Sequence, residues 1–262
     1  MKKINYKKSI SAILSVIVII TFFGTQFAYA TPIRLIQKNI ASEGGPADVS
    51  FTTTPHPGNT VVVAVTLYTV TENPFDPGDV TDNQGNTYRL AKTQTSPGGD
   101  DQGAIFYASD IKASGTYTVS YVGGGSISIY EYEGISKNNP LDKISSGNGS
   151  SNNANSGNIT TNIANELYFG VAWSIISGDT WAANNGFVLE NTVTDNDTHE
   201  RHAVADKVGP AQTTSADFSI GVSSSWLALV ATFKPEDTEN PTSKVEISQP
   251  IIIKGNGTID IR

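Results

Sequence analysis

Short runs of alternating apolar residues, separated by turn-forming residues, are the feature that most limits what this chain can fold into. Clusters of Pro, Gly and Asn lie between the runs, and no segment after residue 40 keeps a 3.6-residue apolar stripe for three turns. The runs are rich in β-branched and aromatic side chains, which is typical of strands. They are residues 60–67, 87–93, 104–108, 115–121, 126–132, 166–173, 186–193, 202–208, 216–220 and 226–233. This pattern predicts an all-β protein.

The number and spacing of the runs predict the architecture. Nine or ten strands at this spacing favour a two-sheet antiparallel β-sandwich, of jelly-roll or immunoglobulin-like form, with a barrel as the alternative. We expect residues 31–39 to lead into the first strand. The segment GNGSSNNANSGN, residues 147–158, is polar and of low complexity, so we expect a mobile loop between strands there.

The first 30 residues have the three parts of a secretory signal peptide. Four lysines precede an apolar run from Ile10 to Phe23, and Ala28-Tyr29-Ala30 offers small residues at both positions that signal peptidase reads. The apolar run has about 14 residues, fewer than the roughly 20 that a spanning helix needs. We therefore expect an N-terminal signal helix, cleavage after Ala30, and an exported mature chain without a membrane span.

Charge and cysteine content narrow the classes of partner. The whole chain has a net charge of −8, and the signal holds four of the 17 basic residues and none of the 25 acidic ones. The mature chain therefore keeps 13 basic residues and has a net charge of −12. Such a chain lacks the positive surface that nucleic acid and anionic membranes require. Because there is no cysteine, disulfides and thiolate metal sites are excluded.

A second boundary lies near residue 235. The last apolar run is followed by the charged, proline-bearing hinge KPEDTENP, and a new alternating segment then continues from Val245 to Ile261. This segment is too short to bury a core of its own. We therefore expect three parts: a signal peptide at 1–30, a β-sandwich domain at 31–235, and at 236–262 a linker with the truncated start of an immunoglobulin-like domain.

Six segments resemble a known kind of secreted module. They are GNTVVVAVTLY, VTDNQGNTYRLA, GAIFYASDIKASGTYTVSY, ISIYEYEGI, NELYFGVAW and SSWLALVATFKP. Over residues 49–235 they are similar to a β-sandwich module of bacterial and archaeal secreted surface proteins, and the tail resembles the start of a bacterial immunoglobulin-like repeat. The resemblance implies the fold. It leaves the function open, because such modules serve adhesins, cell-wall proteins and enzyme accessories alike.

Glu131 and Glu133 are the candidates for catalysis. On a strand, alternation places both carboxylates on one face and the two neighbouring tyrosines on the other. The pair is similar to the E-x-D-x-E strand of retaining jelly-roll glucanases, which presents nucleophile and acid on one face. Here Ile129 stands at the first position of that pattern, where the nucleophile is needed. We therefore expect structural carboxylates and no enzyme activity.

Asp76, Asp79 and Asp82 are the candidate metal ligands. They lie in the oxygen-rich segment DPGDVTDN, and calcium takes six to eight oxygen ligands that sandwich loops can supply. The linear pattern D-x-D-x-D-G is absent, and Asp and Asn also form turns. If the module binds an ion, we expect calcium at these three residues.

Two other patterns contain residue types that occur in binding sites. His199 and His202 stand three residues apart, which suits neither a strand face nor the helical i, i+4 pair of zinc proteases, so we expect a charged hairpin tip over 195–202. Trp173 and Trp226 lie in apolar runs and are expected in the core. Trp181 lies in a candidate loop, where its indole would either cap the core or stack on a sugar ring.

Two classes of function follow. The first is a secreted, non-catalytic cell-surface binding or adhesion module of a larger multidomain protein, with an extracellular or cell-surface glycan or protein as its partner. It fits the signal peptide, the truncated C-terminal segment and the absence of a serine-hydrolase elbow or phosphate-binding glycine loop. The alternative is an accessory or catalytic domain of an extracellular glycan hydrolase, with Glu131 or Glu133 as the acid.

Overall fold

The computed structural model describes most of the chain between residues 31 and 236. The described residues are 31–43, 47–67, 75–99, 101–123, 125–175, 180–192, 202–236, 253–254 and 258–259. Their regular structure consists of strands alone, so the all-β prediction is confirmed for this part of the chain. In these ranges there is also no helix of the length and hydropathy needed to cross a membrane. The expected signal helix lies outside the described residues.

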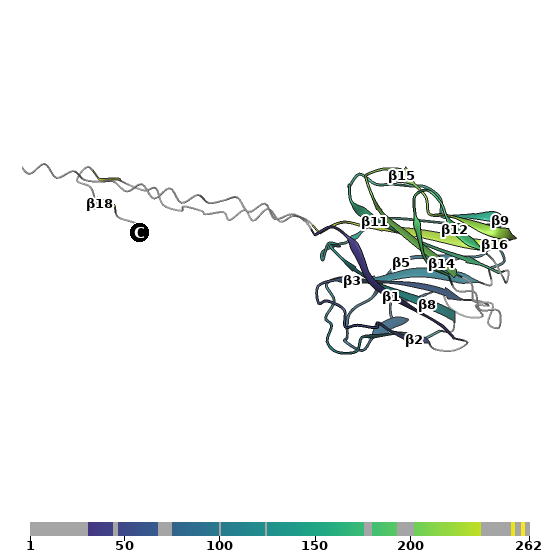
Figure 1. Cartoon of the computed structure of the whole chain (residues 1–262), viewed down its shortest axis with the longest axis horizontal. Coiled ribbons are helices and arrows are strands. Elements are labelled where there is room, and N and C mark those ends of the chain that lie inside the picture. Colours follow the sequence, from purple (N-terminus) through teal and green to yellow (C-terminus); the bar gives the residue numbers. More distant parts are fainter. Residues whose placement is uncertain are drawn as a thin grey trace, which may run out of the picture. The chain divides into compact units, whose positions relative to one another are not determined.

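A five-stranded antiparallel sheet forms the middle layer of the compact unit Tyr29–Glu239 (Figure 1). Its strands are, in order, β1 (Arg34–Glu43), β8 (Gly125–Glu133), β3 (Thr60–Leu67), β6 (Gln102–Ala108) and β5 (Arg89–Thr95). We call it the middle sheet. Strand β3 is buried on both faces of this sheet, which explains why TVVVAVTL reads as an almost continuous apolar run.

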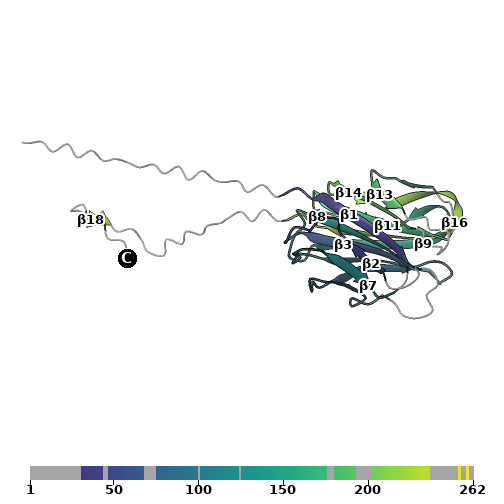
Figure 2. The same cartoon turned by 60° about the horizontal axis from the view of Figure 1, so that its bottom comes forward.

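A small sheet covers one face of the middle sheet (Figure 2). It contains β2 (Ala47–Ser50), β7 (Thr118–Tyr121) and β4 (Val80–Asp82). Alternate residues of the middle sheet, such as Val63, Phe106 and Ile129, pack here against Tyr117 and Val119 in one buried cluster. This face therefore has a hydrophobic core of its own.

A large sheet faces the other side of the middle sheet. Its strands are β9 (Leu141–Asn155), β16 (Asp217–Phe233), β11 (Glu166–Ser174), β12 (Trp181–Ala183), β14 (His202–Gly209) and β13 (Val188–Thr192). Tyr130 and Tyr132 of β8 meet Phe169, Trp173 and Phe233 across this interface. The antiparallel sandwich is therefore confirmed, but its middle sheet carries a further sheet on its far side, which the two-sheet prediction did not include.

The outer face of the large sheet is also buried. Strands β10 (Ile159–Thr160) and β15 (Thr213–Thr214) pair with each other, and Ile159 packs in the same cluster as Tyr168, Phe187 and Phe218. Separately, β17 (Ile253–Lys254) and β18 (Thr258–Ile259) form an antiparallel pair in the C-terminal segment. Whether this pair begins an immunoglobulin-like domain stays a prediction.

The prediction of a mobile loop over 147–158 is wrong. Strand β9 continues to Asn155 and pairs with β16 along its length. The glycines permit close packing: a Cβ atom on Gly149 would lie 2.6 Å from Cζ2 of Trp226, and one on Gly147 would collide with the carbonyl oxygen of Asn155. Polar residues suit β9 because it lies at the edge of the sheet.

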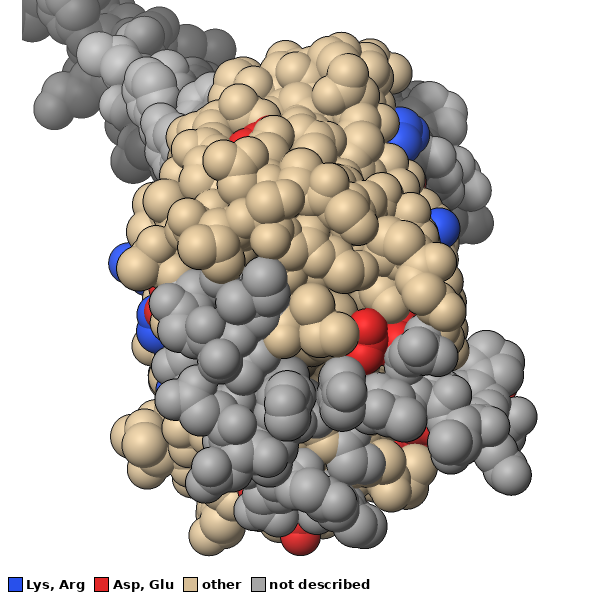
Figure 3. Space-filling view, turned by 90° about the vertical axis from the view of Figure 1, so that its right-hand side faces the viewer, with Lys and Arg blue, Asp and Glu red and all other residues tan. Residues whose placement is uncertain are grey.

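The face around the tips of β9 and β16 shows few charged side chains (Figure 3).

Candidate functional site

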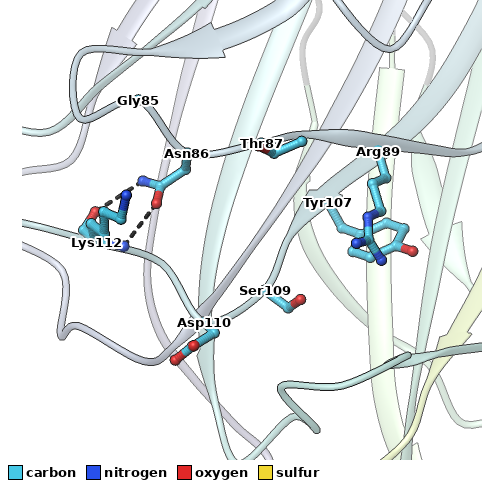
Figure 4. Close-up of a pocket in the computed structure, with 8 residues that line it drawn as sticks. All are labelled: Gly85, Asn86, Thr87, Arg89, Tyr107, Ser109, Asp110 and Lys112. Atoms are coloured by element: carbon cyan, nitrogen blue, oxygen red, sulfur yellow. Dashed lines mark hydrogen bonds between the residues drawn. The ribbon is translucent and has the colours of Figure 1, made fainter.

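A hollow of about 210 Å³ lies where β5 begins and β6 ends (Figure 4). Its walls come from the connection between β4 and β5 and from the segment that follows β6. The lining residues are Gly85, Asn86, Thr87, Arg89, Tyr107, Ser109, Asp110 and Lys112. We call this cavity the hollow.

Asp82 at the end of β4 fixes the wall that contains Gly85 and Asn86. Its carboxylate accepts hydrogen bonds from the backbone N–H of Gln84 (2.9 Å) and of Asn86 (3.1 Å), and from the Tyr117 hydroxyl (2.6 Å). Burial raises the pKa of Asp82, but the hydrogen bonds from Tyr117, Asn86 and Gln84 outweigh it and hold the pKa below its ordinary value. Asp82 is therefore an ionised turn former.

Asn86 joins the two walls of the hollow. Its Nδ2 donates to Asp82 Oδ2 and to the Lys112 carbonyl, both at 2.9 Å, while its Oδ1 accepts from the Lys112 backbone N–H at 2.7 Å (Figure 4). Gly85 before it has φ +73°, a left-handed conformation that glycine adopts without strain. The loop is thus held by side-chain hydrogen bonds, and the Asn86 amide is largely used in structure.

Tyr107 and Arg89 form the opposite side. They are directly paired residues of β6 and β5, so their side chains lie on the same face of the middle sheet. The Tyr107 ring is buried against Phe233, with ring centroids 5.4 Å apart, whereas Arg89 is exposed. Figure 4 shows the Arg89 guanidinium beside the Tyr107 ring and the Lys112 side chain on the far side of the hollow.

The charges at the hollow are unevenly paired. Asp110 Oδ1 lies 3.9 Å from Lys137 Nζ, and Lys137 also lies 4.0 Å from Glu236. The guanidinium of Arg89 and the ammonium of Lys112 form no hydrogen bond or ion pair with any other described side chain or backbone group. The hollow therefore presents two free cations and hydroxyl groups of Thr87 and Ser109 to a ligand.

Glu131 is a structural carboxylate. It is fully buried, and its Oε1 accepts hydrogen bonds from the His56 backbone N–H (2.7 Å) and Asn59 Nδ2 (2.6 Å), while Oε2 accepts from Gln37 Nε2 (2.6 Å). The tyrosines beside it face the large sheet, as alternation predicts. Glu133 forms an ion pair with Arg34. Both glutamates thus already have protein partners.

Asp76 and Asp79 form a turn with each other. The Asp76 backbone N–H donates to Asp79 Oδ2 at 2.8 Å, and the Asp79 backbone N–H donates to the Asp76 carbonyl at 3.0 Å. Within the described ranges, no group of three or more His, Asp or Glu side chains is placed to hold a metal ion. Calcium at Asp76, Asp79 and Asp82 stays a prediction.

His202 lies in the core, so the prediction of a charged hairpin tip is wrong for this residue. It begins β14 and is fully buried between the middle and large sheets, with Nδ1 3.0 Å from Thr66 Oγ1 and Nε2 hydrogen-bonded to Ser128 Oγ. Burial lowers the pKa of His202 to about 3, so the ring is neutral. His199 lies outside the described residues.

Trp181 lies on β12 and is only 9% exposed. Its ring packs edge to face against Phe218, with centroids 6.2 Å apart and an interplanar angle of 89°. This contact belongs to the outer core of the large sheet. Residues 176–179 before it lie outside the described part, and sugar binding by Trp181 stays a prediction.

Sequence reasoning did not select the hollow. Arg89, Tyr107 and Lys112 carry no motif: the pairing of β5 with β6 places Arg89 beside Tyr107, and the hydrogen bonds of Asn86 hold the Lys112 backbone at the other wall. A lone arginine at the start of a strand, in an acidic chain, is the only local signal that points to this site.

No protein-family model, no curated protein and no solved structure matches this chain. The class of protein therefore rests on the fold: an all-β chain whose antiparallel sheets pack face to face.

Proposed function

We propose that the chain is a secreted, non-catalytic binding module of a larger cell-surface protein, and that it binds an extracellular glycan in the hollow. The observation that carries this proposal is the free cationic and hydroxyl groups around the hollow, whose two walls are joined by the hydrogen bonds of Asn86. Binding residues commonly lie on connections that a rigid scaffold positions. Sugar hydroxyls can both donate hydrogen bonds to such groups and accept hydrogen bonds from them.

The buried state of Glu131 favours a binding module over a glycan hydrolase. A catalytic acid must come within hydrogen-bond distance of the glycosidic oxygen. Glu131 is fully buried and accepts three hydrogen bonds from its own chain, and Glu133 is paired with Arg34. The signal-like first 30 residues and the resemblance to secreted surface modules support export.

A glycan array with the mature chain, residues 31–262, tests this proposal. We expect retention of a defined set of glycans, with no release of reducing ends, and nuclear magnetic resonance shifts concentrated at residues 85–89 and 107–112. The matched variant is Glu131→Gln. Hydrolysis that this variant abolishes while its melting curve shows it to be folded would show that the chain is an enzyme, and an array without any bound glycan would contradict glycan binding.

A further inference from the structure

The two free cations of the hollow stand out because the chain is acidic. It has 25 Asp and Glu residues against 17 Lys and Arg. Lys38, Lys137 and Lys143 have carboxylate partners, and Lys92 and Lys234, which have none among the described residues, do not line the hollow. Arg89 and Lys112 have none among the described residues, although they line the same cavity. An anion placed between them would gain attraction from both.

Asp110, the single acidic residue of the lining, does not neutralise Arg89 and Lys112. Asp110 faces Lys137, whose Nζ lies 3.9 Å away, and its side chain is 61% exposed. Taken together, the eight lining residues carry two positive charges and one negative charge. The hollow therefore favours a ligand with one negative charge, although the molecule as a whole repels polyanions.

The neutral groups of the hollow suit a sugar ring that carries this charge. The Ser109 hydroxyl donates to the Lys137 carbonyl at 3.2 Å, which leaves its oxygen lone pairs as acceptors. Thr87 adds a second hydroxyl, and Tyr107 adds an aromatic edge. The volume of about 210 Å³ is below the roughly 300–1,000 Å³ of pockets for drug-sized ligands, which indicates one sugar residue.

We propose that the hollow binds the carboxylate of an acidic sugar residue, a uronic acid, with Arg89 and Lys112 on either side of the charged group. This inference rests on the proposed glycan-binding function and names its ligand class. The planar guanidinium of Arg89 pairs with the two oxygens of a carboxylate in a fork, and Lys112 adds a point charge. The hydroxyls of Thr87 and Ser109 bind the ring hydroxyls.

Two glycosides that differ only in the carboxylate test this inference: methyl β-D-glucuronide and methyl β-D-glucoside. Calorimetry with the mature chain at low salt should give at least about a tenfold tighter Kd for the glucuronide, since charge-assisted hydrogen bonds are roughly twice as strong as neutral ones. That preference should shrink as ionic strength rises, because the cations are exposed. Glucose 6-phosphate serves as the second anion.

The variants Arg89→Gln and Lys112→Gln should each weaken glucuronide binding about tenfold and leave glucoside binding unchanged. Lys92→Gln is the matched control, because Lys92 lies on the same strand as Arg89 but outside the hollow. Arg89→Lys should restore part of the loss. Unchanged melting temperatures show that the variants are folded.

Three results would overturn the inference. Equal affinity for the two glycosides would remove the preference for an acid and leave the proposed function standing. An equal loss of glucuronide affinity in Lys92→Gln would mean that the affinity depends only on the net charge of the protein. Tighter binding of glucose 6-phosphate than of the glucuronide would assign the hollow to phosphate. By contrast, the proposed function itself fails if no glycan on the array binds.

Discussion

Asp206 gives the stability of the fold a marked pH dependence. Burial raises its pKa to about 6, a hydrogen bond from Tyr132 lowers it, and the charge of Glu190 raises it. The folded state therefore holds a proton that the unfolded chain loses near pH 4. The resulting stabilisation is complete below pH 4 and is lost as the pH rises through 6, at most about 3 kcal/mol. In urea unfolding, the stability of the wild type relative to Asp206→Asn should fall by up to this amount between pH 4 and pH 6, and the difference should stay constant above that pH.

His202 acts in the opposite direction. Its pKa is lowered to about 3 by burial, so the unfolded chain takes up a proton below about pH 6.5 that the folded chain refuses. Its contribution is complete above pH 6.5 and is lost as the pH falls toward 3. We expect His202→Asn to be less stable at pH 7, by about 1–3 kcal/mol, because Thr66 and Ser128 lose hydrogen bonds. Below pH 6 the deficit should shrink, and a constant deficit would contradict a buried neutral ring.

Strand β8 depends on Glu131 for its link to the segment between β2 and β3. Three donors converge on this carboxylate, so Glu131→Gln would turn an amide N–H toward one of them. We expect a loss of about 2–4 kcal/mol in the free energy of unfolding, since a buried donor is left without an acceptor. Chemical denaturation measures this loss. Glu133→Gln on the same strand is the control, and a similar effect of both variants would argue against the buried role.

Strand β9 depends on glycine for its contact with β16. The Cβ atom of Gly149→Ala would press on the Trp226 ring at 2.6 Å, and the indole Nε1 is held in place by a hydrogen bond to Ser151 at 2.9 Å. We expect a destabilisation of about 1–3 kcal/mol in thermal or urea unfolding. Gly78→Ala, which has no atom within 4 Å, should change stability by less than about 1 kcal/mol. Equal losses of stability in Gly149→Ala and Gly78→Ala would show that β9 can shift to accommodate the added methyl group.

A strand can be predicted from the sequence when its own residues determine its structure, and not when residues far along the chain do. The sequence predicts strands β3 and β14 at residues 60–67 and 202–208 because both strands are largely buried. Their own residues are therefore apolar, and this is visible in the sequence. Strand β9 was missed because its order comes from Trp226, far along the chain, and its own residues are small and polar. The hollow was missed for the same reason, since Arg89 and Lys112 line one cavity only once the chain has folded.

At the scale of the molecule, three stacked sheets leave the middle one shielded on both faces. Strand β3 pairs with β6 on one side and β8 on the other, and its residues from Thr60 to Thr66 are buried. We expect the slowest hydrogen exchange of the whole chain in β3, whereas the edge strand β13 should exchange early. Exchange followed by mass spectrometry checks this order. Faster exchange in β3 than in β13 would contradict the layering.

The first and last residues of the sandwich meet at Gly134. A Cβ atom there would lie 2.5 Å from the Thr31 carbonyl oxygen, and the Gly134 carbonyl accepts a hydrogen bond from the Glu236 backbone N–H at 2.7 Å. A pull applied between residues 31 and 236 would therefore load this junction before it loads the strands of the three sheets.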